Sequence, residues 1–493
     1  MQRSNDFTTG GILSPLLRFM IPVFFAMLLQ AMYGAVDLLI VGKFAESLDV
    51  SAVSTGSQIM MTLTNLVSSF AMGTTILLGQ RIGEGRRKEG GQVIGSSICL
   101  FAAIAGALTV LIAALCRPIS TLMNAPAEAF DETARYIMIC GLGSFFIISY
   151  NLIGSIFRGI GDSRTPLMTV AIACVCNIIG DLLLVAVCGW GTAGAAIATV
   201  LAQAVSVVIS LLILRRKQLP FELSRSDLRF RAPVIRKVVS LGLPIALQDF
   251  LVGISFLVIL AIVNGLGLVA SAGVGVAEKV CGFIMLIPAA FMQAMAAFVA
   301  QNIGAGKYGR AKKTLLYAVS VSMILAVGMF ALTFWRGDLL SGIFAKDAPV
   351  IAASADYLKA YAIDCLLTCF LFCFIGFYNG LGMTRFVMIQ VIVGAFLVRI
   401  PVAFLMSREV PPSMFHIGLA TPCSTVLQVA LCLIWFRIAN KKYRSLAGPQ
   451  AECVMILPAH SIERPVPGGI RYENEILAAR SCSGPPVGRA RCR

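Results

Sequence analysis

The sequence predicts an all-α membrane protein whose twelve transmembrane helices form two six-helix lobes related by a pseudo-two-fold axis along the membrane normal. Hydrophobic residues make up 58% of the 493 positions and charged residues only 13%, whereas soluble domains carry roughly a quarter charged residues. The chain also repeats itself: QRIGEG at 80–85 returns as QNIGAG at 301–306, and FRGIGDSR at 157–164 returns as YNGLGMTR at 378–385. A duplicated hydrophobic chain is typical of secondary transporters, in which two similar halves face each other across a cavity.

Twelve hydrophobic runs are long enough to cross a bilayer, which takes about 20 helical residues. In lipid, helices of this length satisfy their own backbone N–H and C=O groups, so every run is expected to be a helix. The first run follows a polar start and is too long for a signal peptide, so it is expected to remain as an uncleaved span. The runs are 15–40, 54–78, 92–115, 136–157, 166–188, 192–214, 238–263, 272–299, 314–335, 358–379, 386–406 and 417–437.

Basic residues gather in the connections on one side of these runs. That side holds Arg81, Arg86, Arg87, Lys88, Arg215, Arg216, Lys217, Arg225, Arg229, Arg231, Arg236, Lys237, Lys307, Arg310, Lys312, Lys313, Lys441, Lys442 and Arg444. The other side holds only scattered cases such as Lys43, Arg117, Arg336 and Arg408. This asymmetry predicts a multi-pass protein of the cell (inner or cytoplasmic) membrane with both termini in the cytoplasm. Because the net charge of +16 is spread over short loops, it does not form a nucleic-acid-binding face.

The basic connection at 215–237 divides the chain into an N-terminal lobe, 1–214, and a C-terminal lobe, 238–445. Each half has an even number of spans, so both halves have the same orientation and are not inverted repeats. From 446 to 493 glycine, proline and arginine break any hydrophobic periodicity, which predicts a disordered cytoplasmic tail. Such a tail could touch anionic lipid, but an inert extension is the favoured interpretation.

Four polar residues inside the N-terminal lobe are candidates for an ion-coupling site. Asp37 lies in the first span and Asp181 in the fifth, and a buried charge costs about 2.5–3.5 kcal/mol at the centre of a membrane helix. Asn177 shares a helix face with Asp181, and Thr199 of the sixth span lies at a similar depth. Hydrogen bonds between helices would explain Asn177 and Thr199 equally well. The two aspartates favour a site for H⁺ or Na⁺, because spans one to six hold no basic residue at that depth.

The acids of the C-terminal lobe have basic residues in the same lobe. Asp249, Glu278 and Asp364 occur together with Lys279 and Arg399. Acids that have basic neighbours form structural ion pairs more often than functional sites. We therefore expect ion pairs in this lobe and place the ion-coupling site in the N-terminal lobe.

Pro22 and Pro244 occupy matching places in the first helix of each half. A proline inside a helix removes one hydrogen bond and permits a bend, although membrane helices also tolerate it as a packing feature. If Pro22 lets the first helix bend, protonation of Asp37 would remove a buried charge and allow that helix to adopt another packing.

Several kinds of chemistry are not indicated. The sequence has no G-x-x-x-x-G-K-[ST] string, so it is not expected to hydrolyse ATP. Only His416 and His460 are present, and the fifteen cysteines lie mostly inside apolar runs without metal-ligand spacing. We therefore expect no enzymatic activity, no metal centre other than a possible Na⁺ at the ion-coupling site, and no cofactor apart from the coupling ion, H⁺ or Na⁺.

Five strings resemble the MATE (multidrug and toxic compound extrusion) family, and its DinF-like branch in particular. They are MYGAVDLLIVGKFA at 32–45, GQRIGEG at 79–85, FRGIGDSRTP at 157–166, NIIGDLLLV at 177–185 and AQNIGAGK at 300–307. The resemblance covers about 10–440. It implies export of cationic or amphipathic organic compounds in exchange for inward H⁺ or Na⁺ by alternating access.

The resemblance also assigns residues. Asp37 matches the first-helix aspartate of the family, and Asn177, Asp181 and Thr199 match the polar set that joins it in the DinF-like branch. Other branches use acids in spans seven and ten, but Asp249 and Asp364 are out of register with those places. The implied partners are small organic molecules and membrane lipid, without nucleic acid, and a monomer is expected to be functional.

Two other interpretations compete with this one. A flippase for lipid-linked sugars would need several Arg and Lys lining a lobe, which spans one to six do not offer. A membrane scaffold or receptor would not need a duplicated core with intramembrane acids. The natural substrate, the choice between H⁺ and Na⁺, the oligomeric state and the role of the tail after 446 stay open at the level of sequence.

Overall fold

The computed structural model describes residues 7–216, 221 and 224–446, and every regular element in these ranges is helical. Eleven helical segments there are long and apolar enough to cross a membrane, and the bent pair Ala127–Leu142 and Ser144–Gly159 makes a twelfth if it is one span. The predicted all-α fold with twelve spans is therefore confirmed. The predicted tail lies outside the described residues apart from Leu446.

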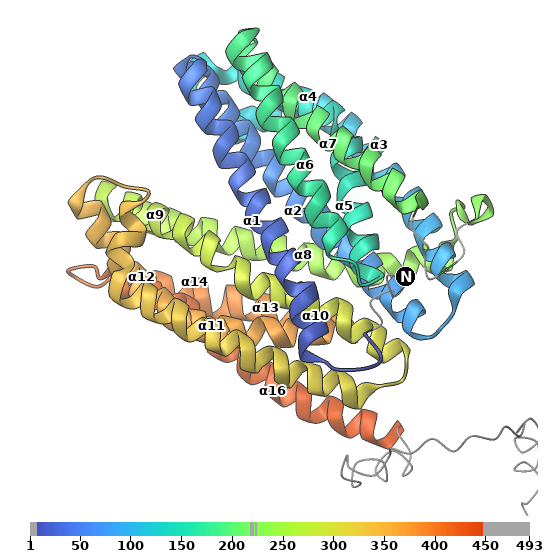
Figure 1. Cartoon of the computed structure of the whole chain (residues 1–493). Helices are drawn as coiled ribbons and strands as arrows, with labels where there is room; N and C mark the ends of the chain where they lie inside the picture. The colour runs from blue at the N-terminus through green and yellow to red at the C-terminus, as the bar shows by residue number, and fades with distance from the viewer. Residues whose placement is uncertain (1–6, 217–220, 222–223, 447–493) are drawn as a thin grey trace, which may run out of the picture. The chain divides into compact units, whose positions relative to one another are not determined.

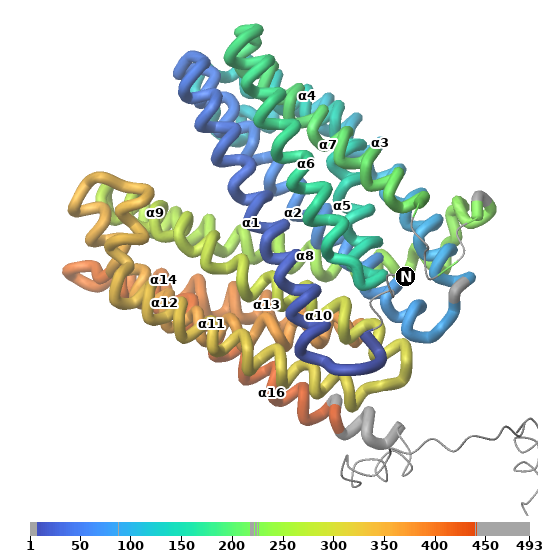
Figure 2. Tube along the Cα trace, in the orientation of Figure 1, coloured from blue at the N-terminus to red at the C-terminus, as the bar shows by residue number. Residues whose placement is uncertain are grey.

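The first bundle follows the chain from blue to green in Figures 1 and 2. Its elements are α1 (Leu13–Phe44), α2 (Ser47–Gly83), α3 (Arg87–Leu122), η1 (Ala127–Ala129), α4 (Phe130–Leu142), α5 (Ser144–Gly159), α6 (Arg164–Asp181), η2 (Leu182–Val187) and α7 (Gly191–Arg216). Several of these helices are longer than the predicted spans. Hydropathy marks only the part of a helix that crosses lipid, whereas the helix continues through the polar interface on both sides.

The second bundle continues from green to orange-red in the same figures. Its elements are α8 (Ala232–Asn264), α9 (Leu268–Ile284), α10 (Leu286–Gly304), α11 (Tyr308–Gly342), α12 (Ala348–Gly380), α13 (Thr384–Gly394), η4 (Ala395–Arg399), α14 (Ile400–Met406), α15 (Met414–Gly418) and α16 (Ala420–Leu446), and η3 (Arg225–Asp227) precedes α8. Helix α8 begins six residues before the predicted span because Pro233 fixes a helical φ in its first turn. The exact boundaries of the two lobes stay a prediction.

The fourth predicted span, 136–157, is broken. Helices α4 and α5 meet at Gly143 with a bend of 52°. A side chain on Gly143 would overlap the methyl groups of Val200 on α7, so the glycine permits a close approach at the bend. Hydropathy could not reveal this break, because it records polarity and not the direction of the backbone.

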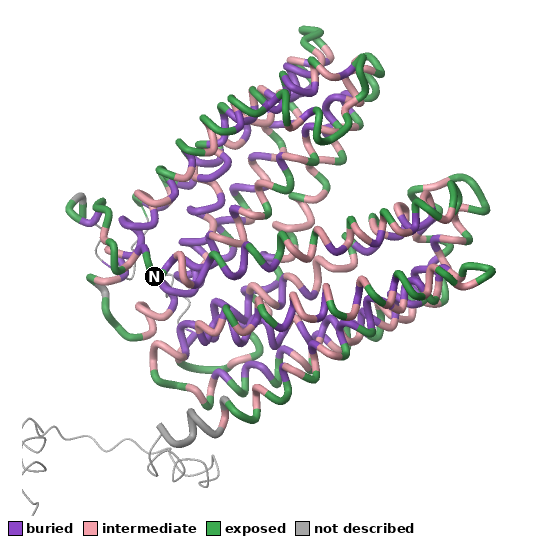
Figure 3. The backbone as a smooth tube through the Cα atoms, turned by 180° about the vertical axis from the view of Figure 1, so that it is seen from behind, coloured by how far each residue is buried: buried purple, intermediate pink, exposed green. Residues whose placement is uncertain are grey.

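Burial follows the helix faces, as expected in lipid. Figure 3 shows buried residues where helices of a bundle face one another and exposed residues along outer faces and loops. Many of the exposed side chains are large and apolar, for example Leu39, Val110 and Ile324 at 67%, 70% and 72% exposure. On a soluble protein such surfaces would be unfavourable, whereas on these helices they are typical of contact with acyl chains.

Contacts between residues group the helices up to Arg437 into one compact unit. Within this unit the two bundles meet through the repeated motif. Gln80 Nε2 donates a hydrogen bond to the carbonyl of Gly380 at 3.2 Å, and Gln301 Nε2 donates to the carbonyl of Gly159 at 3.0 Å. Each repeat of the motif thus contacts the other half of the chain in a reciprocal way.

Candidate functional site

Three neighbouring elements of the first bundle carry the predicted ion-coupling residues. Asp37 lies on α1, Asn177 and Asp181 on α6, and Thr199 on α7, and these helices pack against one another. The four-residue spacing of Asn177 and Asp181 puts both on the face of α6 that is buried in the bundle. The structure therefore brings all four predicted residues to one place.

The four side chains interact in two pairs. Asn177 Nδ2 lies 3.5 Å from Thr199 Oγ1, at the long limit of a hydrogen bond. The carboxyl groups of Asp37 and Asp181 lie near enough to each other to interact electrostatically. Asp37 is 2% exposed, whereas Asn177 and Asp181 are fully buried.

Four buried oxygens in this cluster have no hydrogen-bond partner in the described part of the chain. They are Asp37 Oδ1, Asn177 Oδ1 and both carboxylate oxygens of Asp181. Buried polar atoms are normally hydrogen-bonded, so several orphaned oxygens in one place require an explanation. All four are acceptors, and a proton or a small cation is the kind of species that acceptors alone can hold.

Two tyrosines that the sequence analysis missed, the partly buried Tyr33 and the buried Tyr136, lie beside the acids. The Tyr33 hydroxyl is buried close to Thr199, Asp37 and Asp181, and Tyr136 of α4 lies close to Asp37 and Tyr33. Tyr33 could have been found, because it precedes Asp37 by four residues and shares its helix face. Tyr136 gives no such signal, since its helix is remote in sequence and its orientation depends on tertiary packing.

The backbone changes character next to Asp181. Helix α6 ends at Asp181, and η2 continues it as a π-helix over Leu182–Val187. π-Helical turns inside longer helices occur frequently at functional sites. The second bundle has a corresponding π-helical segment, η4, which ends at the buried Arg399.

The predicted helix-bending prolines are both buried inside continuous helices. Pro22 lies in α1 and Pro244 in α8, and each helix runs through its proline without a break. Their proposed part in bending stays a prediction.

The predicted ion pairs of the second bundle are wrong. Among the described residues, no basic nitrogen lies within 4.0 Å of a carboxylate oxygen of Asp249, Glu278 or Asp364, and Lys279 and Arg399 have no ion-pair partner. Lys279 is exposed, whereas Glu278 is partly buried on the same helix, α9. Adjacent residues of a helix point in different directions, which separates this pair.

Local contacts occupy the other charged groups. Asp364 accepts a hydrogen bond from Thr368, one turn further along α12, at 2.8 Å. Arg399 donates to Ser255 at 3.0 Å, and its guanidinium lies 4.5 Å from the centroid of the Phe256 ring, a typical cation–π arrangement. Asp249 accepts a hydrogen bond from Ser69 of the first bundle.

Comparison with known proteins gives a consistent assignment. A family model described as MatE matches residues 22–183 and 244–405, one block in each half. "Probable multidrug resistance protein YpnP" of Bacillus subtilis is 26% identical over 398 residues, which cover 79% of this chain and 86% of that protein. "Multidrug export protein MepA" of Staphylococcus saprophyticus is 23% identical over 402 residues, with 81% and 88% coverage.

Solved structures share the fold. One described as "Outward-facing conformation of a multidrug resistance MATE family transporter of the MOP superfamily" superposes with a TM-score of 0.84 at 17% identity and covers 90% of this chain and 99% of its own. Another, "Crystal structure of MATE in the bent conformation", gives a TM-score of 0.83 at 18% identity with 90% and 99% coverage. At these identities the likeness establishes the fold alone.

Proposed function

The chain belongs to the MatE family, and from this premise we propose that it is a multidrug efflux transporter that exchanges drugs or amphipathic and cationic organic compounds for inward H⁺ or Na⁺. Membership of a transporter family agrees with the prediction that the protein is not an enzyme. The observation that carries the antiport part of the proposal is the buried Asp37–Asp181 pair, in which three carboxylate oxygens have no hydrogen-bond partner among the described residues.

The physical basis is the repulsion between two buried carboxylates. Two unit charges about 4 Å apart repel by about 4 kcal/mol at an effective dielectric constant near 20. One proton shared by Asp37 and Asp181, or one Na⁺ bound by their oxygens, would remove this repulsion. Ion binding and release would therefore change the packing of α1 against α6 and α7, and this change would couple the ion to alternating access of the substrate.

The donor set fits either ion. Carboxylate, amide and hydroxyl oxygens are the ligands that hard cations prefer, and Asn177, Thr199 and Tyr33 could supply the last two kinds beside the aspartates. The described residues contain no group of three or more His, Cys, Asp or Glu side chains that could hold a metal ion. The site suits a singly charged ion with two carboxylates better than a resident divalent metal.

Asp37→Asn tests the proposal in proteoliposomes loaded with a fluorescent organic cation. We expect the wild-type protein to export the cation in a way that depends on an imposed H⁺ or Na⁺ gradient, whichever is the coupling ion. Asp37→Asn should lower gradient-driven export at least tenfold, because a permanently neutral side chain mimics one state of the cycle. Asp181→Asn should be similarly severe.

Asp364→Asn of the second bundle is the matched control. It removes an equally buried carboxylate and should affect mainly the folding yield, with near-normal transport per inserted molecule. A normal amount of inert Asp364→Asn protein would place the coupling site in the second bundle. Wild-type export by Asp37→Asn under a gradient would exclude Asp37 from coupling.

Location and assembly complete the proposal. The helices identify a multi-pass membrane protein, and the distribution of basic residues supports a cell membrane with both termini in the cytoplasm. One chain contains both halves, which supports function as a monomer. The flippase alternative would need several basic side chains lining one lobe, whereas Arg158, at the end of α5, donates a hydrogen bond to Ser155.

A further inference from the structure

A small cavity lies between α2, α3 and α8, away from the Asp37–Asp181 site. Its volume is about 220 Å³. Its polar lining comes from Arg81, Glu89, Gln92 and Lys237, and Leu77 and Val234 contribute to its apolar wall. The lining of the cavity therefore contains both charged and apolar side chains, as a site for a lipid headgroup and the first carbons of its chains requires.

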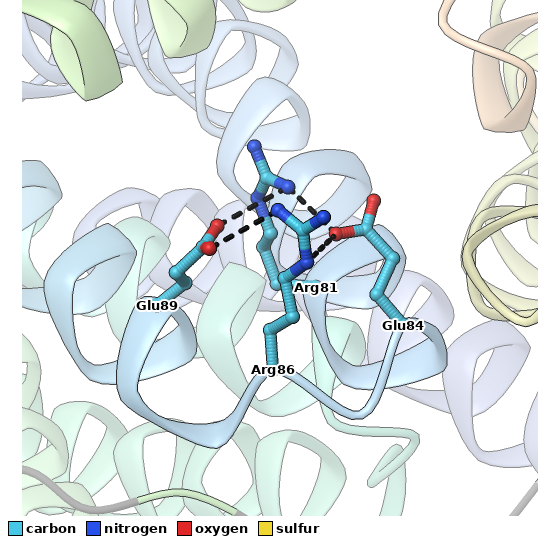
Figure 4. Close-up of polar contacts among 4 residues, drawn as sticks. All are labelled: Arg81, Glu84, Arg86 and Glu89. Carbon is cyan, nitrogen blue, oxygen red and sulfur yellow. Dashed lines mark hydrogen bonds and ion pairs between the residues drawn. The ribbon is translucent and has the colours of Figure 1, made fainter. Parts of the chain in front are cut away.

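An ion-pair cluster holds one side of this cavity in place. Figure 4 shows the guanidinium groups of Arg81 and Arg86 side by side, with Glu84 on one side of them and Glu89 on the other. Arg81 lies 2.6 Å from Glu84 and 3.2 Å from Glu89, whereas Arg86 lies 3.3 Å and 3.1 Å from the same two carboxylates. Two positive and two negative charges cancel, so the cluster fixes Arg81 at the cavity without adding a net charge.

Lys237 carries a positive charge that the ion-pair cluster does not neutralise. The structure gives Lys237 and Gln92 no hydrogen-bond or ion-pair partner among the described residues. Lys237 is exposed and Gln92 is partly buried. One uncompensated ammonium and one available amide therefore face the same cavity.

The position of the cavity favours an anionic lipid over a soluble ligand. It lies at the end of α2 and near the start of α8, beside the basic connections that the charge asymmetry assigns to the cytoplasm. Basic pockets between transmembrane helices on that side bind the headgroups of anionic phospholipids. Apolar side chains such as Leu77 and Val234 can contact the first carbons of an acyl chain, which a soluble phosphate ester lacks.

We propose that this cavity binds the phosphodiester headgroup of an anionic phospholipid, with Lys237 and Arg81 facing the phosphate and Gln92 donating a hydrogen bond. The bound lipid would contact α2 and α3 of the first bundle and α8 of the second at once. This site is separate from substrate and ion transport, so its test does not depend on the proposed function.

Lipid retention tests the site directly. The full-length protein is purified from vesicles of equal parts phosphatidylglycerol and phosphatidylcholine, and native mass spectrometry counts the retained lipid. We expect wild-type protein to retain phosphatidylglycerol selectively and Lys237→Gln to bind it about fivefold more weakly, as expected for one lysine near an anionic surface. Val234→Phe should cause a similar loss by filling the cavity without a change of charge.

Two controls decide what the result means. Lys313→Gln removes an exposed lysine of α11 that is not part of the cavity, and it should retain phosphatidylglycerol like wild type. Glycerol phosphate added in excess should not displace the lipid. Equal retention in wild type, Lys237→Gln and Val234→Phe would overturn the proposal, and displacement by glycerol phosphate would reassign the cavity to a soluble phosphate ester.

Discussion

Tyr33 is the residue whose position says most about how the proposed coupling site would bind its ion. Its hydroxyl is buried without a hydrogen-bond partner in the described chain, close to Thr199 and both aspartates. A phenol can donate to a carboxylate or accept a cation through its oxygen. The hydroxyl is therefore placed to bind whichever species the carboxyl pair binds.

Tyr33→Phe keeps the ring and removes only this hydroxyl. We expect the coupling-ion concentration for half-maximal export to rise about tenfold, because a hydrogen bond to a charged group contributes about 1.5–3 kcal/mol. Export at saturating ion should stay close to wild type. The measurement is efflux from proteoliposomes over a series of ion concentrations.

Tyr150→Phe provides the comparison for this prediction. Tyr150 packs against the apolar core of the same bundle on α5 and lies outside the site. Its variant should have the ion dependence of wild type. An unchanged ion dependence in Tyr33→Phe would mean that the hydroxyl serves packing and not ion binding.

At the scale of residues, the sequence predicted where side chains lie better than it predicted which groups they contact. Asp37, Asn177, Asp181 and Thr199 meet as expected, because each residue's helix and depth follow from hydropathy and the spacing of Asn177 and Asp181. The expected ion pair of Arg399 does not form, because a long side chain can contact any of its tertiary neighbours and the sequence does not identify them. Here a hydroxyl and an aromatic ring, both from α8, take that place.

At the scale of elements, the segment before α1 makes contacts that the sequence analysis did not predict. Phe7 is 1% exposed, and its ring stacks on that of Phe298 of α10 with 4.7 Å between ring centroids. The ring of Phe19 lies edge-on to Phe7, with 5.3 Å between centroids. Arg310 of α11 donates hydrogen bonds to the carbonyls of Phe7, Thr9, Gly10 and Gly11. The start of the first bundle is thus tied to the second bundle.

The sequence could not predict these hydrogen bonds, because the donor and acceptor residues lie about 300 positions apart in the chain. Residues 2–9 read only as a polar start, and Arg310 only as one of the basic residues that set orientation. Backbone carbonyls carry no sequence signal, so an arginine that binds four of them is visible only after folding. The phenylalanines likewise show their stacking only in three dimensions.

Arg310→Gln should release the segment at 7–11 from the second bundle. Several hydrogen bonds to a charged donor are lost, and the local free energy of opening should fall by about 2–3 kcal/mol. We expect limited proteolysis to cleave this segment at least tenfold faster than in wild type. Lys312→Gln, on the same helix and exposed, should leave the cleavage rate unchanged, and equal rates for all three proteins would show that Arg310 does not hold the segment.

At the scale of the whole molecule, the two copies of the repeated motif contact each other, which the repetition in the sequence did not reveal. The duplication predicted two similar halves, which the two matched blocks and the fold confirm. It did not predict that the two copies touch each other. Gln80 and Gln301 bond carbonyls of the opposite half, and a side chain on Gly83 or Gly304 would overlap the carbonyl of Gln301 or Gln80.

This reciprocal contact should control how closely the bundles approach at the basic end. In the proposed alternating access, contacts between the two halves would form and break during each transport cycle. A methyl group at Gly83 or Gly304 cannot be accommodated without a backbone shift, since the atom in its way belongs to the main chain. Both glycines are therefore needed for the close contact between the two copies of the motif.

Gly83→Ala and Gly304→Ala should shift the protein toward states in which this contact is open. Hydrogen–deuterium exchange measures the shift, and amides of 80–86 and 301–307 should exchange faster in both variants because opening one copy of the motif frees the other. Gly309→Ala is the matched control, since it lies just beyond the motif and a Cβ there meets no atom within 4 Å. If Gly83→Ala speeds exchange only in its own segment, the two copies open independently, and the motif does not act as one reciprocal contact.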